Sequence, residues 1–396
     1  MELDGWILQF RRERERNGIS RKAVAAAAGL SREYLCRVGS GKMPLTDQMQ
    51  RRLAAALKAL YPEPLNLMID YVRIRFSTMD IEYILERVLR LKMKYFVQED
   101  HGFYSYSSMY VLGDITVMTS PDEEKGVLLE LKGKGCRQFE AYLNGQKRSW
   151  YEFFRQCLEE DAVFKRIDLA INDRAGILDI PFLCDKCDRG ECISVFRSFK
   201  AYRSGELVRS REENRASMGA TLYIGSMQSD LYFCIYEKDY EQFVKQGVPI
   251  EDAETKNRFE IRLKNDRAYH AVYDLVSGEN PENTAFGIIN RYVRFVDQDD
   301  NKPREDWPLN QMWAVFIGAH RERLKLTTAP EPYTVQKTLN WLSHQVAPSW
   351  KMLLELDRKC GTNVMEEMLA VTELADKHRK IIEQQLLSVG EVIVSE

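Results

Sequence analysis

The chain has 396 residues, 44% of them hydrophobic and 30% charged, which is typical of a soluble globular protein with two or three domains. Its 57 Lys and Arg residues nearly balance 60 Asp and Glu residues, and the net charge of −3 argues against a wholly basic nucleic-acid coat protein. The N-terminus lacks the pattern of a signal peptide, and no stretch is apolar enough for a membrane span. We therefore expect a cytoplasmic protein with no membrane partner.

The first sixty residues read as an all-α unit with twelve basic and six acidic side chains. Ser20 is a plausible N-cap of one helix, Gly29 breaks the pattern, and Ser31 caps a second helix. This arrangement resembles the phage-repressor (Xre-like) helix-turn-helix family, in which the start of the second helix faces the bases of DNA. The expected domain covers residues 1–61, and the expected DNA contacts are Ser31, Arg32, Tyr34 and Arg37. A plain helical bundle with a solvated basic face is the alternative.

The middle of the chain alternates between strand and helix patterns without a strict βαβ repeat. Strands are predicted at Tyr71–Phe76, Tyr104–Thr119 (a pair), Val127–Lys132, Phe164–Ile171, Thr221–Ile224, Leu231–Tyr236 and Phe259–Leu263. The expected fold class is α+β, with a central antiparallel-sheet domain over residues 67–328. A helical C-terminal region follows over residues 331–396, with helices at Val335–Val346, Met352–Arg358 and Val364–Gln385. That region could serve in dimerisation or in contacts with accessory proteins.

One predicted strand carries candidate catalytic residues. Tyr232, Cys234 and Tyr236 share a strand face, and Lys238 could extend it. A tyrosine hydroxyl, with a pKa near 10, is a poor nucleophile unless a cation or a base activates it. A hairpin with purely structural aromatic residues is the alternative interpretation.

Three other strands each place an acidic residue between apolar neighbours: Glu130, Asp168 and Glu260. A buried carboxylate is costly unless it is paired or binds a cation. Arg166 shares a strand face with Asp168, and two arginines flank Glu260, so ion pairing is one explanation. The other is a carboxylate site for Mg²⁺ or Mn²⁺.

Three motifs in order resemble a known family. They are RIDLA at Arg166–Ala170, LYIGS…FCIYEKDYEQ at Leu222–Gln242 and RFEIRLK at Arg258–Lys264. The chain from about Leu67 to Leu326 resembles the trans-acting rolling-circle replication initiators of Gram-positive plasmids. With the N-terminal helices, it is most similar to the MobT relaxases of integrative and conjugative elements.

The resemblance implies a mechanism. The family's nucleophilic tyrosine falls on Tyr236, and its acidic metal site falls on Asp168 and Glu260, with Glu130 as a weaker correspondence. The chain departs from the plasmid initiators, which tend to have arginine at the positions of Met227 and Cys234. Lys238 and Arg166 are the nearest cations that could compensate, and Arg166 is a fifth expected DNA contact.

The expected function is therefore that of a metal-dependent relaxase. It would bind an origin of transfer, nick one strand through a 5′-phosphotyrosine intermediate and rejoin the ends, with conjugation accessory and coupling proteins as possible partners. Two alternatives remain: a plasmid replication initiator with the same chemistry, and a helix-turn-helix regulator that cuts nothing.

Overall fold

The computed structural model describes residues 5–17, 19–39, 43, 45–61, 64–205, 217–250, 252–318, 326, 328–330, 343 and 346–394. The chain forms two compact units. Unit 1 comprises Met1–Asp70 and Arg166–Thr327, and unit 2 comprises Tyr71–Lys165 and Thr328–Glu396. Strands β1 (Leu65–Phe76) and β6 (Val163–Asp173) carry the chain across this division. The predicted segments 1–61, 67–328 and 331–396 therefore do not coincide with the two units.

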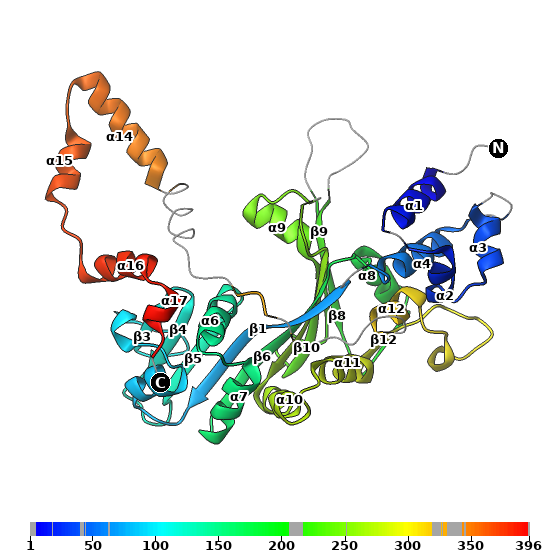
Figure 1. Ribbon diagram of the computed structural model, residues 1–396, viewed down its shortest axis with the longest axis horizontal. Coiled ribbons are helices and arrows are strands. Elements are labelled where there is room, and N and C mark those ends of the chain that lie inside the picture. Colours follow the sequence, from blue (N-terminus) through cyan, green and yellow to red (C-terminus); the bar gives the residue numbers. More distant parts are fainter. Residues whose placement is uncertain are drawn as a thin grey trace. The chain divides into compact units, whose positions relative to one another are not determined.

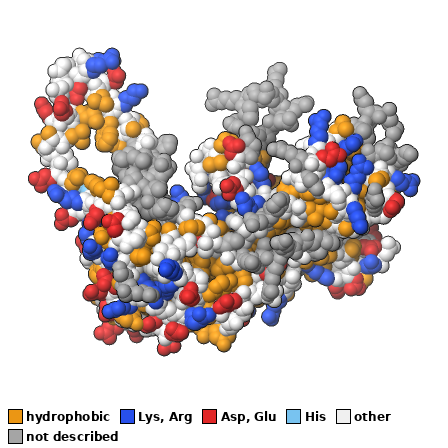
Figure 2. All heavy atoms as spheres, viewed as in Figure 1, with side chains coloured by type: hydrophobic (Ala, Val, Ile, Leu, Met, Phe, Trp, Pro, Cys, Tyr) orange, Lys and Arg blue, Asp and Glu red, His pale blue; other side chains and the backbone are white. Residues whose placement is uncertain are grey.

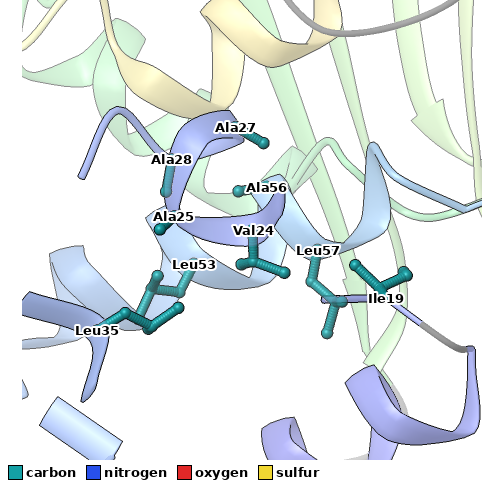
Figure 3. Packing of buried hydrophobic residues seen from close by; sticks show 9 residues of the cluster. All are labelled: Ile19, Val24, Ala25, Ala27, Ala28, Leu35, Leu53, Ala56 and Leu57. Carbon is teal, nitrogen blue, oxygen red and sulfur yellow. The ribbon is translucent and has the colours of Figure 1, made fainter. Parts of the chain in front are cut away.

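Unit 1 begins with four helices: α1 (Gly5–Arg16), α2 (Arg21–Ala27), α3 (Arg32–Gly39) and α4 (Asp47–Lys58). Their apolar faces form one core, in which small alanines let α2 and α4 approach closely (Figure 3). The buried members are Ile19, Val24, Ala25, Ala27, Ala28, Leu35, Leu53, Ala56 and Leu57. Lys and Arg side chains gather on the outside of these helices (Figure 2).

The turn between α2 and α3 follows the pattern expected from the sequence. Ser20 caps α2 through the N–H of Ala23, and the Ser31 hydroxyl accepts the N–H of Tyr34 in the first turn of α3. Gly29 has φ +61°, a left-handed conformation that favours glycine. Arg52 of α4 closes the turn by donating to the carbonyl oxygen of Ala28 at 2.7 Å. The two short helices are thereby fixed against α4.

The rest of unit 1 is built on an antiparallel sheet, whose strands run in the order β6, β11, β10, β9, β8 (Figure 1). Strands β11, β10, β9 and β8 span Asn257–Lys264, Leu231–Glu237, Ser217–Ile224 and Phe199–Gly205. Helices in this part are α8 (Ile180–Asp188), α9 (Lys238–Gln246), α10 (Asn265–Gly278), α11 (Pro281–Tyr292) and α12 (Gln311–Phe316). A small second sheet pairs β7 (Cys192–Ser194) with β12 (Val293–Phe295).

The register of this sheet separates an apolar face from a polar one. Phe233 lies opposite Ile261, and Ile261 lies opposite Leu169, so buried apolar side chains line up across three strands. The alternate positions are polar and face the other way. Tyr236 lies opposite Arg258, Cys234 opposite Glu260, and Arg262 opposite Asp168. The motifs found in the sequence thus meet on one face.

Unit 2 has its own antiparallel strands. The end of β1 pairs with β5 (Val127–Lys132), which is followed by β4 (Ile115–Thr119), β3 (Ser108–Leu112) and β2 (Val97–Glu99). The helices are α5 (Ile81–Tyr83), continued by a π-helical turn at Ile84–Val88, then α6 (Lys134–Gly145) and α7 (Trp150–Glu159). Close ring contacts among Phe139, Trp150, Phe153, Phe154 and Phe164 form an aromatic core.

The tail contributes α14 (Ala347–Cys360), α15 (Val364–Val371), α16 (Asp376–Leu386) and α17 (Val389–Val392). The single helix expected over Val364–Gln385 is wrong: it is interrupted between α15 and α16. Of the expected helix Val335–Val346, only residues 343 and 346 are described. Gln384 of α16 donates to the carbonyl oxygen of Tyr95, whereas α14 and α15 bury no residue and expose apolar side chains (Figure 2).

The fold is α+β, as the sequence predicts. Among the residues that the structure describes, no helix has both the length and the apolar composition needed to span a membrane.

Candidate active site

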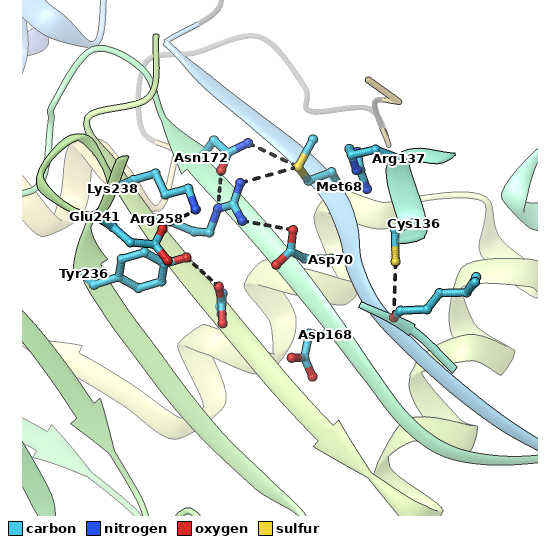
Figure 4. A network of polar contacts seen from close by, with 12 residues as sticks. Met68, Asp70, Cys136, Arg137, Asp168, Asn172, Tyr236, Lys238, Glu241 and Arg258 are labelled. Carbon is cyan, nitrogen blue, oxygen red and sulfur yellow. Dashed lines mark hydrogen bonds and ion pairs between the residues drawn. The ribbon is translucent and has the colours of Figure 1, made fainter. Parts of the chain in front are cut away.

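Tyr236 stands near the end of β10 on the polar face of the unit 1 sheet (Figure 4). Its hydroxyl donates a hydrogen bond to Oε1 of Glu260 on the neighbouring strand, at 2.9 Å. Burial, and then the negative charge of Glu260, raise the pKa of Tyr236 well above its ordinary value. The tyrosine is therefore held as a neutral phenol beside a carboxylate that could accept its proton.

Glu260 and Asp168 are linked through arginines. Arg262 lies 2.6 Å from Oε2 of Glu260, and its Nε lies 3.7 Å from Oδ2 of Asp168. Arg166 donates two hydrogen bonds to Asp168, from Nε to Oδ1 at 2.8 Å and from Nη2 to Oδ2 at 2.6 Å. Burial raises the pKa of Asp168 to about 6, although Arg166 acts in the opposite direction. The expected ion pairs are present, and they join two buried carboxylates on adjacent strands.

A third arginine lies directly across from Tyr236. Arg258 donates from Nε to Oδ1 of Asn172 at 2.7 Å and from Nη1 to Oδ1 of Asp70 at 2.9 Å (Figure 4). These two bonds fix the guanidinium beside the tyrosine ring. Arginines presented on one rigid sheet face can bind phosphate oxygens in a fixed geometry.

Lys238, the predicted second catalytic residue, begins α9 directly after β10. Its ammonium group lies 5.6 Å from the centre of the Tyr236 ring and pairs with Glu241. A cation over the ring stabilises negative charge on the phenol without bonding to its oxygen.

Glu130 belongs to unit 2 and has a different set of partners. It accepts hydrogen bonds from the hydroxyls of Tyr71 and Tyr104, the latter at 2.7 Å, and an ion pair from Lys132 at 2.8 Å. Burial works to raise the pKa of Glu130, but the bonds from Lys132 and the tyrosines prevail and hold it below its usual value. Each of these partners is on Glu130's own unit. Glu130 therefore fixes the positions of two tyrosine hydroxyls and one lysine within unit 2.

Asp168 and Glu260 are the candidate ligands of a metal ion. Among the residues described, no group of three or more His, Cys, Asp and Glu side chains is placed to hold a metal ion. Asp168 and Glu260 nevertheless offer the oxygen donors that Mg²⁺ and Mn²⁺ prefer, and Mg²⁺ is commonly held by one or two carboxylates with water and substrate phosphates. The donor set fits such an ion, which would compete with Arg262 for the carboxylate oxygens.

The predicted DNA contacts of the N-terminal helices lie at α3. Ser31 and Arg37 are exposed, and Tyr34 is partly buried. Arg32 is the first residue of α3, and its side chain is not among those that the structure describes. Arg166, the fifth expected DNA contact, lies on β6 and pairs with Asp168, and its contact with DNA stays a prediction.

Sequence reasoning missed Asp70 and Asn172, the partners of Arg258. Asn172 lies four positions after Asp168 in the same strand, so the two residues share a strand face. The alternation of the strand could therefore have identified Asn172. Asp70 lies just before the predicted start of its strand, which in fact begins at Leu65. Two positions depart from the arginines of the plasmid initiators. Cys234 lies opposite Glu260, and Met227 lies in the exposed turn between β9 and β10. In that turn, Lys264 donates a hydrogen bond to the Met227 carbonyl oxygen at 2.7 Å.

The chain is similar to known proteins. Residues 162–369 match the family described as "Replication initiation factor", and residues 66–156 match the "Rolling Circle replication initiation protein N-terminal domain". NicK of Bacillus subtilis (strain 168), named as a candidate DNA relaxase, is 42% identical over 332 residues, which cover 84% of this chain and 93% of that protein. The solved rolling circle replication initiator protein from Geobacillus stearothermophilus is similar with a TM-score of 0.56 and 26% identity, over 67% of this chain and 99% of that one.

The resemblance predicted from the three motifs is thus confirmed for the part of the chain that follows the N-terminal helices. Those helices precede both family matches, so their Xre-like assignment stays a prediction. By the extent of the match and by its identity to a relative that it covers almost completely, the chain belongs to the replication initiation factor family.

Proposed function

We propose that this protein is a relaxase that nicks and rejoins one strand of origin DNA through Tyr236. The observation that carries the proposal is the hydrogen bond from Tyr236 to Glu260 on a sheet face that also presents Arg258 and Arg262. A phenol with an adjacent proton acceptor and fixed cations is what attack on a phosphodiester requires.

In the proposed step, the Tyr236 oxygen attacks the scissile phosphorus while its proton passes to Glu260. The bond from phosphorus to the 3′ oxygen breaks, the 5′ phosphate stays on the tyrosine, and the departing 3′ oxygen takes a proton from solvent water. Arg258 and Lys238 offset the negative charge that builds up around Tyr236. Because the phosphotyrosine conserves the phosphoester bond, the reverse step rejoins the ends.

Asp168 and Glu260 would hold a divalent cation, Mg²⁺ or Mn²⁺. Such an ion polarises a phosphate oxygen and stabilises a departing alkoxide. The supporting observation is that both carboxylates are buried on adjacent strands and bridged by a single cation, Arg262. The paired glutamate of unit 2, Glu130, takes no part in this proposal.

The N-terminal helices would bind the duplex part of the origin through α3. Their basic surface and the capped turn between α2 and α3 support this role. Transfer of a conjugative element is favoured over autonomous replication because the relative named as a relaxase matches 84% of the chain at 42% identity. The initiator matches 67% at 26%. Accessory and coupling proteins of a conjugation system would be its partners.

The proposal is tested with a labelled single-stranded origin oligonucleotide, the full chain and Mn²⁺ or Mg²⁺, resolved on a denaturing gel. We expect cleavage by the wild type and none by Tyr236→Phe. Tyr240→Phe is the matched control, since Tyr240 lies four residues further on in α9 and should leave cleavage unchanged. Cleavage by Tyr236→Phe would show another nucleophile, and binding without cleavage by the wild type would favour a regulator.

A further inference from the structure

Unit 2 exposes two neighbouring aromatic rings on the loop that precedes β3. The side chains of Phe103 and Tyr104 are 52% and 49% exposed, although rings of this size are usually buried. Each ring is accompanied by a cation. The guanidinium carbon of Arg73 lies 4.5 Å from the centre of the Tyr104 ring, and Nζ of Lys132 lies 5.4 Å from that of Phe103. We call these four residues the aromatic patch.

The aromatic patch is held in place from beneath by Glu130. This carboxylate accepts a hydrogen bond from the Tyr104 hydroxyl and pairs with Lys132, so it fixes one ring and one cation together. Arg73 lies directly opposite Glu130 in the pairing of β1 with β5. The contacts therefore connect a buried glutamate, through two strands, to the exposed loop, and they hold the residues of the aromatic patch in a defined arrangement.

The backbone of the loop is constrained as well. Tyr104 and Ser105 have φ of +58° and +62°, a left-handed conformation that costs free energy in residues other than glycine. Such a conformation persists only where surrounding contacts impose it. The two residues thus indicate a loop whose conformation is set by its contacts, among them the hydrogen bond from Tyr104 to Glu130.

We propose that the aromatic patch binds single-stranded DNA, with bases stacked on Phe103 and Tyr104 and phosphates neutralised by Lys132 and Arg73. Rings with adjacent cations form the usual platform for single-stranded nucleic acid, because every base has a face that can stack. A duplex hides those faces, so the patch selects an unpaired strand. The identity of this ligand rests on the proposed function, since an origin-nicking enzyme has a single-stranded substrate.

The test measures the dissociation constant of a fluorescent oligothymidine strand for the full chain, at fixed salt and without divalent metal. We expect Phe103→Ala and Tyr104→Ala each to weaken binding about tenfold. Tyr104→Phe keeps the ring and should bind within about twofold of the wild type. Tyr83→Ala is the matched control in unit 2, because Tyr83 also donates its hydroxyl to a glutamate, Glu160, but lies outside the loop.

Phe103→Ala is the decisive variant, since its half-exposed ring can be removed without emptying a core, and an unchanged melting temperature verifies the fold. Unchanged binding by Phe103→Ala would overturn the proposal, even if Lys132→Met weakened binding, because the site would then be purely electrostatic. The readout does not depend on nicking. If Phe103→Ala lost binding but the wild type never nicked origin DNA, the patch would be supported and the proposed function rejected. If the wild type nicked origin DNA but Phe103→Ala bound the strand as well as the wild type does, the proposed function would be supported and the patch rejected.

Discussion

Two glutamates in this chain, Glu260 of unit 1 and Glu130 of unit 2, each accept a hydrogen bond from a strand or loop tyrosine, but their surroundings differ. Glu260 shares its other oxygen with Arg262, which also approaches Asp168. Glu130 has a surface lysine and a second tyrosine, Tyr71, as further partners. A tyrosine–glutamate pair alone therefore does not define a nucleophile. In the proposed mechanism, the second carboxylate and the fixed arginines distinguish the Tyr236 site, because phosphoryl chemistry needs charge stabilisation as well as a base.

The largest expected difference between the two glutamates is in catalysis. Glu260→Gln should lower the initial nicking rate by about 10²- to 10⁴-fold, the usual contribution of a positioned proton acceptor. At a saturating concentration of the oligonucleotide, Glu130→Gln should leave the rate within about threefold, since Glu130 supports the aromatic patch and lies outside the groups proposed to react. Both rates are measured on the same single-stranded origin oligonucleotide. If Glu130→Gln also abolished nicking, Glu130 would belong to the metal site and the comparison would fail.

The next difference is in stability. Arg262→Met removes a partner from two buried carboxylates and should lower the free energy of unfolding by about 3–5 kcal/mol. Lys132→Met removes a side chain that is 57% exposed and should cost about 1 kcal/mol or less. Urea unfolding of the two variants at neutral pH compares them directly. Equal losses would show that the two carboxylate sites have the same electrostatic character.

The two sites should also respond to pH with opposite signs. The folded-state pKa of Asp168 is raised to about 6, so ionisation of its carboxylate destabilises the fold as the pH rises from about 4 to about 6. Asp168→Asn should therefore gain stability relative to the wild type over that range, by up to about 3 kcal/mol. The pKa of Glu130 is lowered, so its stabilisation is present above the unfolded-state pKa and is lost as the pH falls.

Glu130→Gln should accordingly be less stable than the wild type at neutral pH, with the difference shrinking in acid. Thermal melts at several pH values, run in metal-free buffer, measure both variants. The same sign for both would contradict the assignment of Asp168 to a site dominated by burial and of Glu130 to a site dominated by hydrogen bonds.

The smallest expected effect separates the binding of duplex DNA from both tyrosine–glutamate pairs. Arg37→Ala on α3 should weaken binding to the origin duplex about tenfold and leave the nicking of a single strand unchanged. Arg11→Ala on α1 is the matched control, since Arg11 is exposed and pairs with Glu15 outside the proposed recognition helix. A loss of nicking in Arg37→Ala would place the N-terminal helices in the catalytic step.

Local patterns predicted much of this molecule. The caps at Ser20 and Ser31 and the glycine turn between them are short-range features, and the structure has them where the sequence indicates. The three motifs likewise fall on adjacent strands of one sheet, because strand alternation puts their polar residues on one face.

What could not be predicted depends on contacts between distant residues. Tyr71 reaches Glu130 across 59 positions, and Asp70 reaches Arg258 across 188, and no spacing rule links such pairs. Strand β8 was missed because all its residues are exposed, so it lacks the apolar alternation of a half-buried strand. The sequence therefore indicated candidate residues for the chemistry, and the pairing of strands decided which of them meet.

The most direct test of the central claim is mass spectrometry of the protein after reaction with a single-stranded origin oligonucleotide and Mn²⁺. We predict a covalent DNA adduct on the peptide that contains Tyr236, absent when the variant is Tyr236→Phe. An adduct on Tyr232 or Tyr240, or cleaved DNA with no adduct at all, would contradict the assignment of Tyr236 as the nucleophile.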